Sequence, residues 1–438
     1  MEETLEFAGK PYPHWKKRFF TIWSGQAISM LGSQITNFAI IWYLTEQTGS
    51  ATVLSIASLF GTLPAVVFSP FAGAFVDRTD RKKVMIFSDI LIALTRLLGM
   101  VLFATGAIQI WHIYLMIFIG SAAGTFQHPA MTASTALMVP KQRLSRVAGM
   151  NQTLNGALNI AGPPLGALLM NLTTIPVIFL IDIITMLMAV LPLLFIPIPQ
   201  PESRKDANGA VVTQTFFEDL KEGMHYVFSW PGLSLLLISA MLINFLIAPA
   251  MSLLPLLITK HFGGNEVQLA LMNSVMGIGM LLGGLTLSVW GGFKKRILTA
   301  FAGMIFSGIG FAVIGFVPGD AFPIAVGAFA LAAFMLPLVN GPIHAVVQAS
   351  VAPEMLGRVT SLISMGAQLA MPIGLAIAGP LSDSIGIQTW FIIGGVVMSL
   401  VGIISFIIPA LNNIETNVHS TGGPVPQTAG APSEAAPK

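Results

Sequence analysis

The chain contains no cysteine and few charged residues. Without cysteine, disulfide frameworks, thiol chemistry and zinc–thiolate sites are excluded. Charged residues make up only 9% of the 438 residues, against about 25% in a typical soluble domain. The net charge of +2 provides no broad basic field for nucleic acid. The sequence also has no glycine-rich phosphate loop and no pair of carboxylates on one face, so we expect no enzyme, no metal and no cofactor.

Apolar residues are abundant instead, at 54% of the chain. A membrane-spanning helix needs about 20 mostly apolar residues. Twelve segments satisfy this: 19–44, 51–76, 84–105, 110–138, 144–170, 174–196, 232–258, 267–290, 297–317, 322–350, 358–382 and 388–410. The sequence therefore predicts an all-α polytopic membrane protein with twelve transmembrane helices.

The basic residues predict the orientation of these spans. With twelve spans, nineteen of the 21 Lys and Arg residues fall on one side, and the exceptions are Lys260 and Arg96. Basic loops face the cytoplasm. We therefore expect both termini to be cytoplasmic.

The chain divides into two similar halves. Pro129 and Pro140 are repeated as Pro342 and Pro353, 213 residues later. Two six-helix halves of the same orientation are the parallel repeats of the major facilitator fold. The predicted divisions are a cytoplasmic N-terminus (1–18), a first half (19–197), a cytoplasmic linker with an amphipathic helix (198–231), a second half (232–411) and a disordered cytoplasmic tail (412–438).

The loop after the second span resembles a facilitator signature, G-x-x-x-D-R-x-G-R-K. Residues 73–83 read GAFVDRTDRKK, so Asp80 stands in the second glycine position. Asp77 could pair with a nearby arginine and accept helix N-terminal amides of the other half, closing the cytoplasmic side. The alternative is a simple basic anchor. The predicted inner latch consists of Gly73, which would let span 2 approach a neighbour closely, and of Asp77, Arg78, Asp80, Arg81, Lys82, Arg146 and Arg358.

The fifth span carries Gly162-Pro163-Pro164-Leu165-Gly166, which resembles the G-P-x-x-G-G signature of facilitator exporters. Glycines one turn apart allow close helix packing, and prolines bend a helix. We interpret Gly162, Pro163 and Gly166 as a helix-bend motif; an ordinary kink is the alternative.

Polar and aromatic side chains recur on several spans. Polar groups in hydrocarbon need partners or water. As a set they predict a substrate cavity, although each could instead make an interhelical hydrogen bond. The candidates are Gln26, Asn37, Phe38, Gln127, His128, Asn151, Asn155, Asn159, Asn244, Phe245, Asn340 and His344.

Few charges are expected inside the membrane: Asp182, Asp89 and Arg96 lie within spans, and Glu46 lies near the outer end of the first span. A charge at the bilayer centre costs roughly 2.5–3.5 kcal/mol, so each needs a reason. They are the candidates for proton coupling, and a structural polar contact is the alternative for Asp182. Asp89 and Arg96 are about 10 Å apart along one helix, so we expect them to pair with other helices.

Several stretches resemble the macrolide-efflux proteins among the drug:proton antiporters. They include Trp42-Tyr43-Leu44-Thr45, the loop with Asp80, Leu356-Gly357-Arg358-Val359 and Met371-Pro372-Ile373-Gly374. The resemblance implies a monomeric exporter in the bacterial inner membrane that binds small-molecule drugs and uses a proton gradient. It departs at 120–124, where many exporters carry an arginine linked to coupling and this chain has none.

We therefore expect proton-driven efflux of amphiphilic drugs, macrolide antibiotics among them, by alternating access. A lipid or siderophore exporter of the same fold is the first alternative. A membrane receptor or assembly factor that transports nothing is the second.

Overall fold

The computed structural model describes residues 5–7, 10–12, 14–198 and 216–415. The side chains of 5–13, Ala74, Asp77, Lys141, 216–220, Pro353 and Glu354 are outside the described part. The predicted disordered tail lies almost wholly beyond it.

The first half contains six long helices. They are α1 (Trp15–Thr48), α2 (Ala51–Arg78), α3 (Arg81–Ala104), α4 (Ile110–Met138), α5 (Leu144–Leu172) and α6 (Ile175–Phe195), with a 3-10 turn η1 (Lys141–Arg143) before α5. A short antiparallel hairpin, β1 (Leu5–Phe7) and β2 (Lys10–Tyr12), precedes α1. The sequence did not lead us to expect this hairpin.

The second half follows the linker helix α7 (Phe216–Ser229), which covers the predicted amphipathic segment. Its elements are α8 (Pro231–Ser252), α9 (Leu254–Leu256), η2 (Leu257–His261), α10 (Glu266–Trp290), α11 (Arg296–Phe316), α12 (Phe322–Ser350), α13 (Pro353–Ile385), α14 (Gln388–Ile407) and α15 (Pro409–Asn412).

The seventh predicted span, 232–258, is not one continuous α-helix. It is interrupted at Leu253 and ends in the π-helical turn η2. Proline lacks the amide proton that an α-helix needs, and Pro249 and Pro255 flank the interruption.

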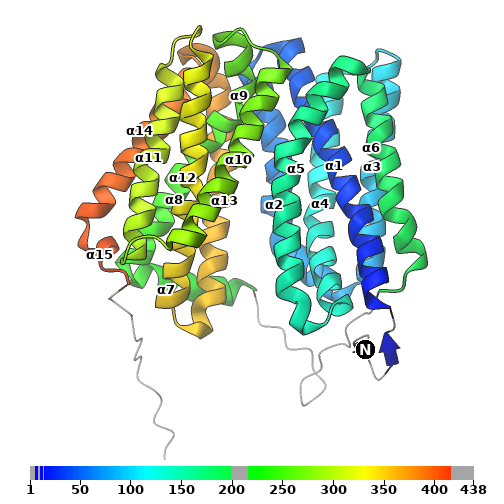
Figure 1. The fold of residues 1–438 in the computed structure, drawn as a ribbon, viewed down its shortest axis with the longest axis horizontal. Coiled ribbons are helices and arrows are strands. Elements are labelled where there is room, and N and C mark those ends of the chain that lie inside the picture. Colours follow the sequence, from blue (N-terminus) through cyan, green and yellow to red (C-terminus); the bar gives the residue numbers. More distant parts are fainter. Residues whose placement is uncertain (1–4, 8–9, 13, 199–215, 416–438) are drawn as a thin grey trace, which may run out of the picture.

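Eleven of the described helices are long and apolar enough to cross a membrane. The predicted span that is not among these eleven is the fifth, 144–170. It corresponds to α5, which has 29 residues but carries Asn151, Asn155 and Asn159 on one stripe. Figure 1 shows α5 running alongside the other long helices. The asparagine stripe therefore lowers the hydropathy of α5 without shortening it.

Among the described residues, the two halves share an apolar cluster at one end of the molecule. We call the end with the first turn of α1, α7 and α15 the terminal face, and the other end the distal face (Figure 1). One apolar cluster joins both halves and includes Leu44 and Leu54 of the first with Leu253 and Ala378 of the second. Two other clusters belong to single halves, one around Phe19 and Val84 and one around Tyr226 and Val359.

Helix direction explains where these clusters lie. The chain enters α1 at the terminal face, so α1 ends and α2 begins at the distal face, where the shared cluster lies. Both single-half clusters contain residues near the opposite ends of their helices, such as Phe19 of α1. The halves are thus packed together distally, and each has its own core near the terminal face.

Candidate functional site

Helix α1 supplies the wall around which the site is built. Gln26, Ser29, Ser33 and Asn37 are spaced at three, four and four residues, which places them on one face of the helix. All four line a cavity of about 540 Å³. Cavities of roughly 300–1,000 Å³ are typical of small-molecule sites.

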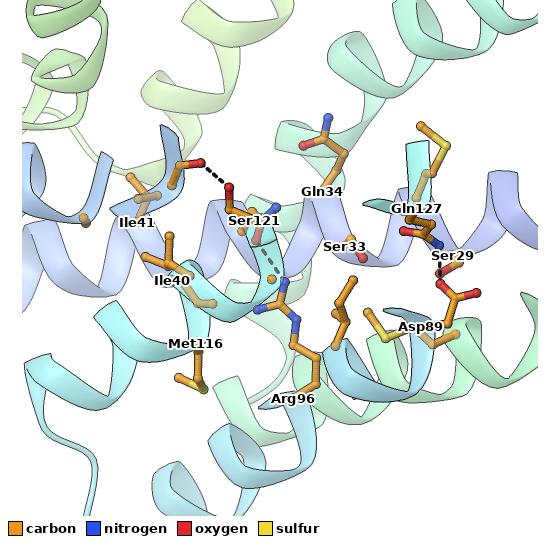
Figure 2. A pocket seen from close by; sticks show the side chains of 18 of the residues that line it. Ser29, Ser33, Gln34, Ile40, Ile41, Asp89, Arg96, Met116, Ser121 and Gln127 are labelled. Atoms are coloured by element: carbon orange, nitrogen blue, oxygen red, sulfur yellow. Dashed lines mark hydrogen bonds between the residues drawn. The ribbon is translucent and has the colours of Figure 1, made fainter. Parts of the chain in front are cut away.

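This main cavity is enclosed by the first half. Its walls come from α1, α2, α3 and α4, with one residue from α6. Figure 2 shows Arg96 and Asp89 of α3 beside the polar face of α1, with Gln127 and Ser121 contributed by α4. Two of the four predicted coupling candidates therefore reach the cavity.

A second cavity of about 400 Å³ lies between the halves. It shares Gln34, Asn37, Ile41 and Ser58 with the main cavity. Helices α8, α9 and α10 of the second half contribute mainly apolar walls, with Ser252 and Asn273 as polar exceptions. The polar lining thus belongs chiefly to the first half.

A third cavity of about 210 Å³ adjoins the main one through Gln26 and Gln127. His128, Asn151 and Asn155 line it. Together the three cavities include the following predicted substrate-cavity residues: Gln26, Asn37, Phe38, Gln127, His128, Asn151, Asn155 and Asn159.

Some of these residues also make interhelical hydrogen bonds. Asn151 Oδ1 accepts from Trp23 Nε1 at 2.7 Å, and Asn159 Oδ1 accepts from Gln34 Nε2 at 3.3 Å. Both bonds join α5 to α1. Asn151 and Asn159 therefore line cavities and also make interhelical hydrogen bonds.

The remaining four candidates line none of these three cavities: Asn244, Phe245, Asn340 and His344. Asn244 donates to Ala240 O of its own helix at 2.9 Å, and Asn340 and His344 are exposed. A place in the substrate cavity therefore stays a prediction for these four residues.

Asp182 and Arg96 form a buried ion pair between α6 and α3. Arg96 Nε lies 3.0 Å from Asp182 Oδ2, and the two side chains are 6% and 0% exposed. Ser33 donates to Asp182 Oδ1 at 3.2 Å, and Arg96 Nη2 donates to Asn37 Oδ1 at 3.1 Å. Both charges therefore have partners, as groups in hydrocarbon require.

Close helix contact makes this pairing possible. A Cβ at Gly32 would lie 2.2 Å from the Thr185 hydroxyl and 3.1 Å from Asp182 Oδ1. Glycine at this point lets α1 approach α6 closely, and Asp182 lines none of the three cavities. Arg96 also lies 6.0 Å from the ring centre of Phe179, within cation–π range.

Asp89 has a different environment. Its carboxylate accepts from Gln26 Nε2 at 3.1 Å and from Gln127 Nε2. No Lys, Arg or His among the described residues forms an ion pair with it. Asp89 is 3% exposed and lines the main cavity, so it is the acid there that has only neutral partners.

Glu46 lies away from this arrangement. It is exposed near the distal end of α1 and lines none of the three cavities. The structure pairs Arg96 with Asp182, places Arg96 and Asp89 on the same cavity, and leaves Glu46 apart.

The predicted inner latch is only partly described, because the side chain of Asp77 is outside the described part. Asp80 caps α3 by accepting from the amides of Lys82 at 3.0 Å and Lys83 at 3.4 Å. Arg81 donates to Ala133 O at 3.1 Å, and the Lys82 ammonium donates to Leu194 O at 3.0 Å. These contacts hold the loop onto its own half.

Two latch expectations differ from what is seen. The close approach expected at Gly73 was wrong for this structure, because a Cβ there would meet no atom within 4 Å. Arg358 forms an ion pair at 3.0 Å with Glu222 of α7, within the second half and its linker. Arg78 and Arg146 are exposed.

The helix-bend motif packs tightly, as the sequence predicted. A Cβ at Gly162 would lie 3.0 Å from Gln34 Cβ, and one at Gly166 would lie 2.8 Å from the Phe38 ring. Helix α5 continues through Pro163 and Pro164. The glycines therefore bring α5 against α1, the wall of the site.

Comparison with known proteins agrees with this architecture. The family model of the Major Facilitator Superfamily matches residues 22–297 and 233–429. The chain belongs to the Major Facilitator Superfamily. Macrolide efflux protein A of Streptococcus pyogenes is 36% identical over 92% of this chain and 98% of its own length. Macrolide efflux protein A of Enterococcus faecalis is 35% identical over 75% of this chain and 100% of its own length.

The fold is also similar to that of a solved transporter. A bacterial homologue of the iron transporter ferroportin, solved in an inward-facing state, superposes with a TM-score of 0.69. The match covers 89% of this chain and 98% of the other at 14% identity, so it supports the major facilitator fold alone. The predicted fold class is confirmed by these findings.

Residues that we did not predict complete the site. Ser29, Ser33, Gln34 and Ser121 line the main cavity, and Asn273 lines the second. The first three continue the polar stripe of α1, so their helical spacing was a usable signal. Ser121 Oγ donates to Gly61 O at 2.6 Å, a contact between α4 and α2 that spacing along the chain does not reveal.

Proposed function

We propose that the chain is a secondary active exporter of amphiphilic drugs, macrolides among them, and that it works by alternating access. The observation that carries this proposal is the 36% identity to macrolide efflux protein A over nearly the full length of both chains. The main cavity carries polar groups of α1, α3 and α4 beside apolar ones such as Met30, Ile92 and Met116, which suits a bulky amphiphile.

Asp89 is the proposed proton site. It lines the cavity without a basic partner among the described residues, whereas Asp182 is already neutralised by Arg96. A glutamine side chain can turn to present either its oxygen or its amide protons. Gln26 and Gln127 could therefore satisfy both the charged and the protonated form of Asp89.

The proposed cycle uses the two faces in turn. The terminal face, with its 19 basic residues on the same predicted side, would be cytoplasmic. In the conformation described, the halves are packed together distally, so drug would enter from the cytoplasm or inner leaflet. Inward proton flow through Asp89 would then return the carrier after release outside, and a single chain would suffice.

A susceptibility panel tests this function. Cells that express the chain should tolerate several-fold more macrolide than cells with an empty vector, and a protonophore should remove the difference. Asp89→Asn should abolish the protection while the protein is still inserted in the membrane. Unchanged susceptibility to every amphiphile tested would contradict the export proposal, and protection that survives the protonophore would contradict proton coupling.

Asp182→Asn distinguishes the roles of the two acids. We expect cells with Asp182→Asn to lose protection in proportion to the folded protein lost from the membrane, because Asp182 is a structural partner of Arg96. A folded Asp182→Asn protein that exports drug without responding to the gradient would instead assign the coupling to Asp182.

A further inference from the structure

The distal face has a charged contact between the halves that has no part in the proposed function described above. Asp383, in the last turn of α13, reaches the first turn of α2 in the other half. Its Oδ1 accepts from the Ala51 amide at 3.1 Å. Its Oδ2 accepts from the Thr52 hydroxyl at 2.7 Å and from the Thr52 amide at 3.4 Å.

This contact stabilises the packing of α13 against α2 through the electrostatics of the helix N-terminus. The first amides of a helix have no partner within the helix, and the N-terminus carries a partial positive charge. Ser50 already satisfies the Val53 amide, and Asp383 takes the two amides before it. Hydrogen bonds to a carboxylate are roughly twice as strong as neutral ones.

The surroundings of Asp383 favour a contact that can break and form again. Asp383 is exposed, so water can replace its partners without the cost of a buried charge. Lys260 of η2 adds an attractive charge interaction with Asp383. Its side chain lies beside Gly49, just before α2. Beneath the Asp383 contact the helices approach closely, since a Cβ at Gly379 would lie 2.9 Å from Thr52 Cα.

The internal repeat relates this contact to another one, between α5 and α10. Asn171 precedes Asp383 by 212 residues, close to the offset between the two halves. Its Nδ2 donates at 2.9 Å to Oε1 of Glu266, the first residue of α10. Asn171 lies in the last turn of α5. Here too, the last turn of a helix in one half meets the first turn of a helix in the other half.

We propose that Asp383 and the first turn of α2 form an outer latch, which holds the distal face closed and releases when the exporter opens outward. Asn171 and Glu266 form its repeat-related partner. Helix α2 takes part at both ends, because its opposite end carries Asp77 of the predicted inner latch. Breaking one latch and making the other would then accompany each half-cycle.

Cysteine crosslinking tests the latch directly, because the natural chain has no cysteine. The hydroxyls of Ser58 and Ser252 lie 2.6 Å apart across the halves, near the distal face. A Ser58→Cys/Ser252→Cys pair should therefore crosslink rapidly under mild oxidation. The measurement needs no drug, so its result is independent of whether the proposed substrate is correct.

Asp383→Ala in this background should slow crosslinking about tenfold, which requires that the closed state lose at least about 1.4 kcal/mol of its preference. Asp383→Asn should cause a smaller loss, since its amide oxygen still accepts one hydrogen bond. Ser384→Ala is the matched control, because the neighbouring Ser384 hydroxyl bonds only Leu381 O of its own helix. It should crosslink like the parent pair.

Thr52→Val provides a second test that leaves Asp383 intact. Alone it should slow crosslinking, and combined with Asp383→Ala it should add no further loss. A rate for Asp383→Ala within twofold of the parent would overturn the proposal, as would an equal loss in Ser384→Ala. Additive losses in the double variant would also overturn it. Each variant should elute from size exclusion as a single folded species, and Asp383→Asn and Thr52→Val keep the test decisive if Asp383→Ala does not.

Discussion

Replacing Asp182 with asparagine should strongly destabilise the first half. The change keeps the shape of the side chain but leaves the Arg96 guanidinium, 5% exposed, without a counter-charge. Removing one partner of a buried ion pair costs about 3–5 kcal/mol. Asn37 still accepts from Arg96 at 3.1 Å, so we expect a cost of about 3 kcal/mol, near the lower limit.

The assay is thermal inactivation of the purified protein in detergent, followed by the fraction that remains monodisperse after heating. Asp182→Asn should lose its folded form at a clearly lower temperature than the parent. The double variant Arg96→Met/Asp182→Leu should recover most of the loss, because apolar replacement of a whole buried pair is often neutral. Asp320→Asn, at an exposed loop acid, is the control.

Two results would refute this reasoning. Asp182→Asn could prove as stable as Asp320→Asn, which would mean that Arg96 does not need its charge partner. The double variant could also prove less stable than the single variant, which would mean that the surrounding helices require the charges themselves.

Three further changes test local features. Gly166→Val should destabilise by about 1–3 kcal/mol through overpacking against α1, whereas Gly149→Ala, with no atom within 4 Å of its Cβ, should be nearly neutral in the same melting assay. Asp80→Ala should cost about 1 kcal/mol by removing the α3 cap, seen as faster hydrogen exchange in that helix's first turn, and Asp80→Asn should restore most of it. Arg358→Gln should speed exchange in α7 with little change in melting, because its partner Glu222 is 59% exposed; unchanged exchange would show that the ion pair does not hold α7.

The fold could be predicted largely because hydropathy reports spans directly. Even α5 was predicted as a span, although its asparagine stripe lowers the hydropathy that marks the others. The interruption at Leu253 was missed, because its flanking prolines also occur inside continuous helices such as α13. Local propensity alone therefore does not decide whether a proline ends a helix.

The site was harder to predict than the fold. Sequence reasoning required a partner for every buried charge, but it could not select Asp182 for Arg96. That pairing depends on how closely α6, α3 and α1 pack, which Gly32 permits. The polar stripe of α1 was readable from its helical spacing.

Contacts between the halves were the least predictable. Asp383 looks like an ordinary acid at the end of a span, and its partner lies 331 residues away in the chain. The repeat offset that relates it to Asn171 was the available signal.

Gradient-driven transport in proteoliposomes tests the central claim most directly. Purified protein would be reconstituted, and uptake of a radiolabelled macrolide would be followed with and without an imposed pH gradient, for the parent and for Asp89→Asn. We expect drug accumulation only with the gradient, its loss on adding a protonophore, and no gradient-driven accumulation in Asp89→Asn. Accumulation that is the same after the gradient collapses, or that persists in Asp89→Asn, would contradict the central claim.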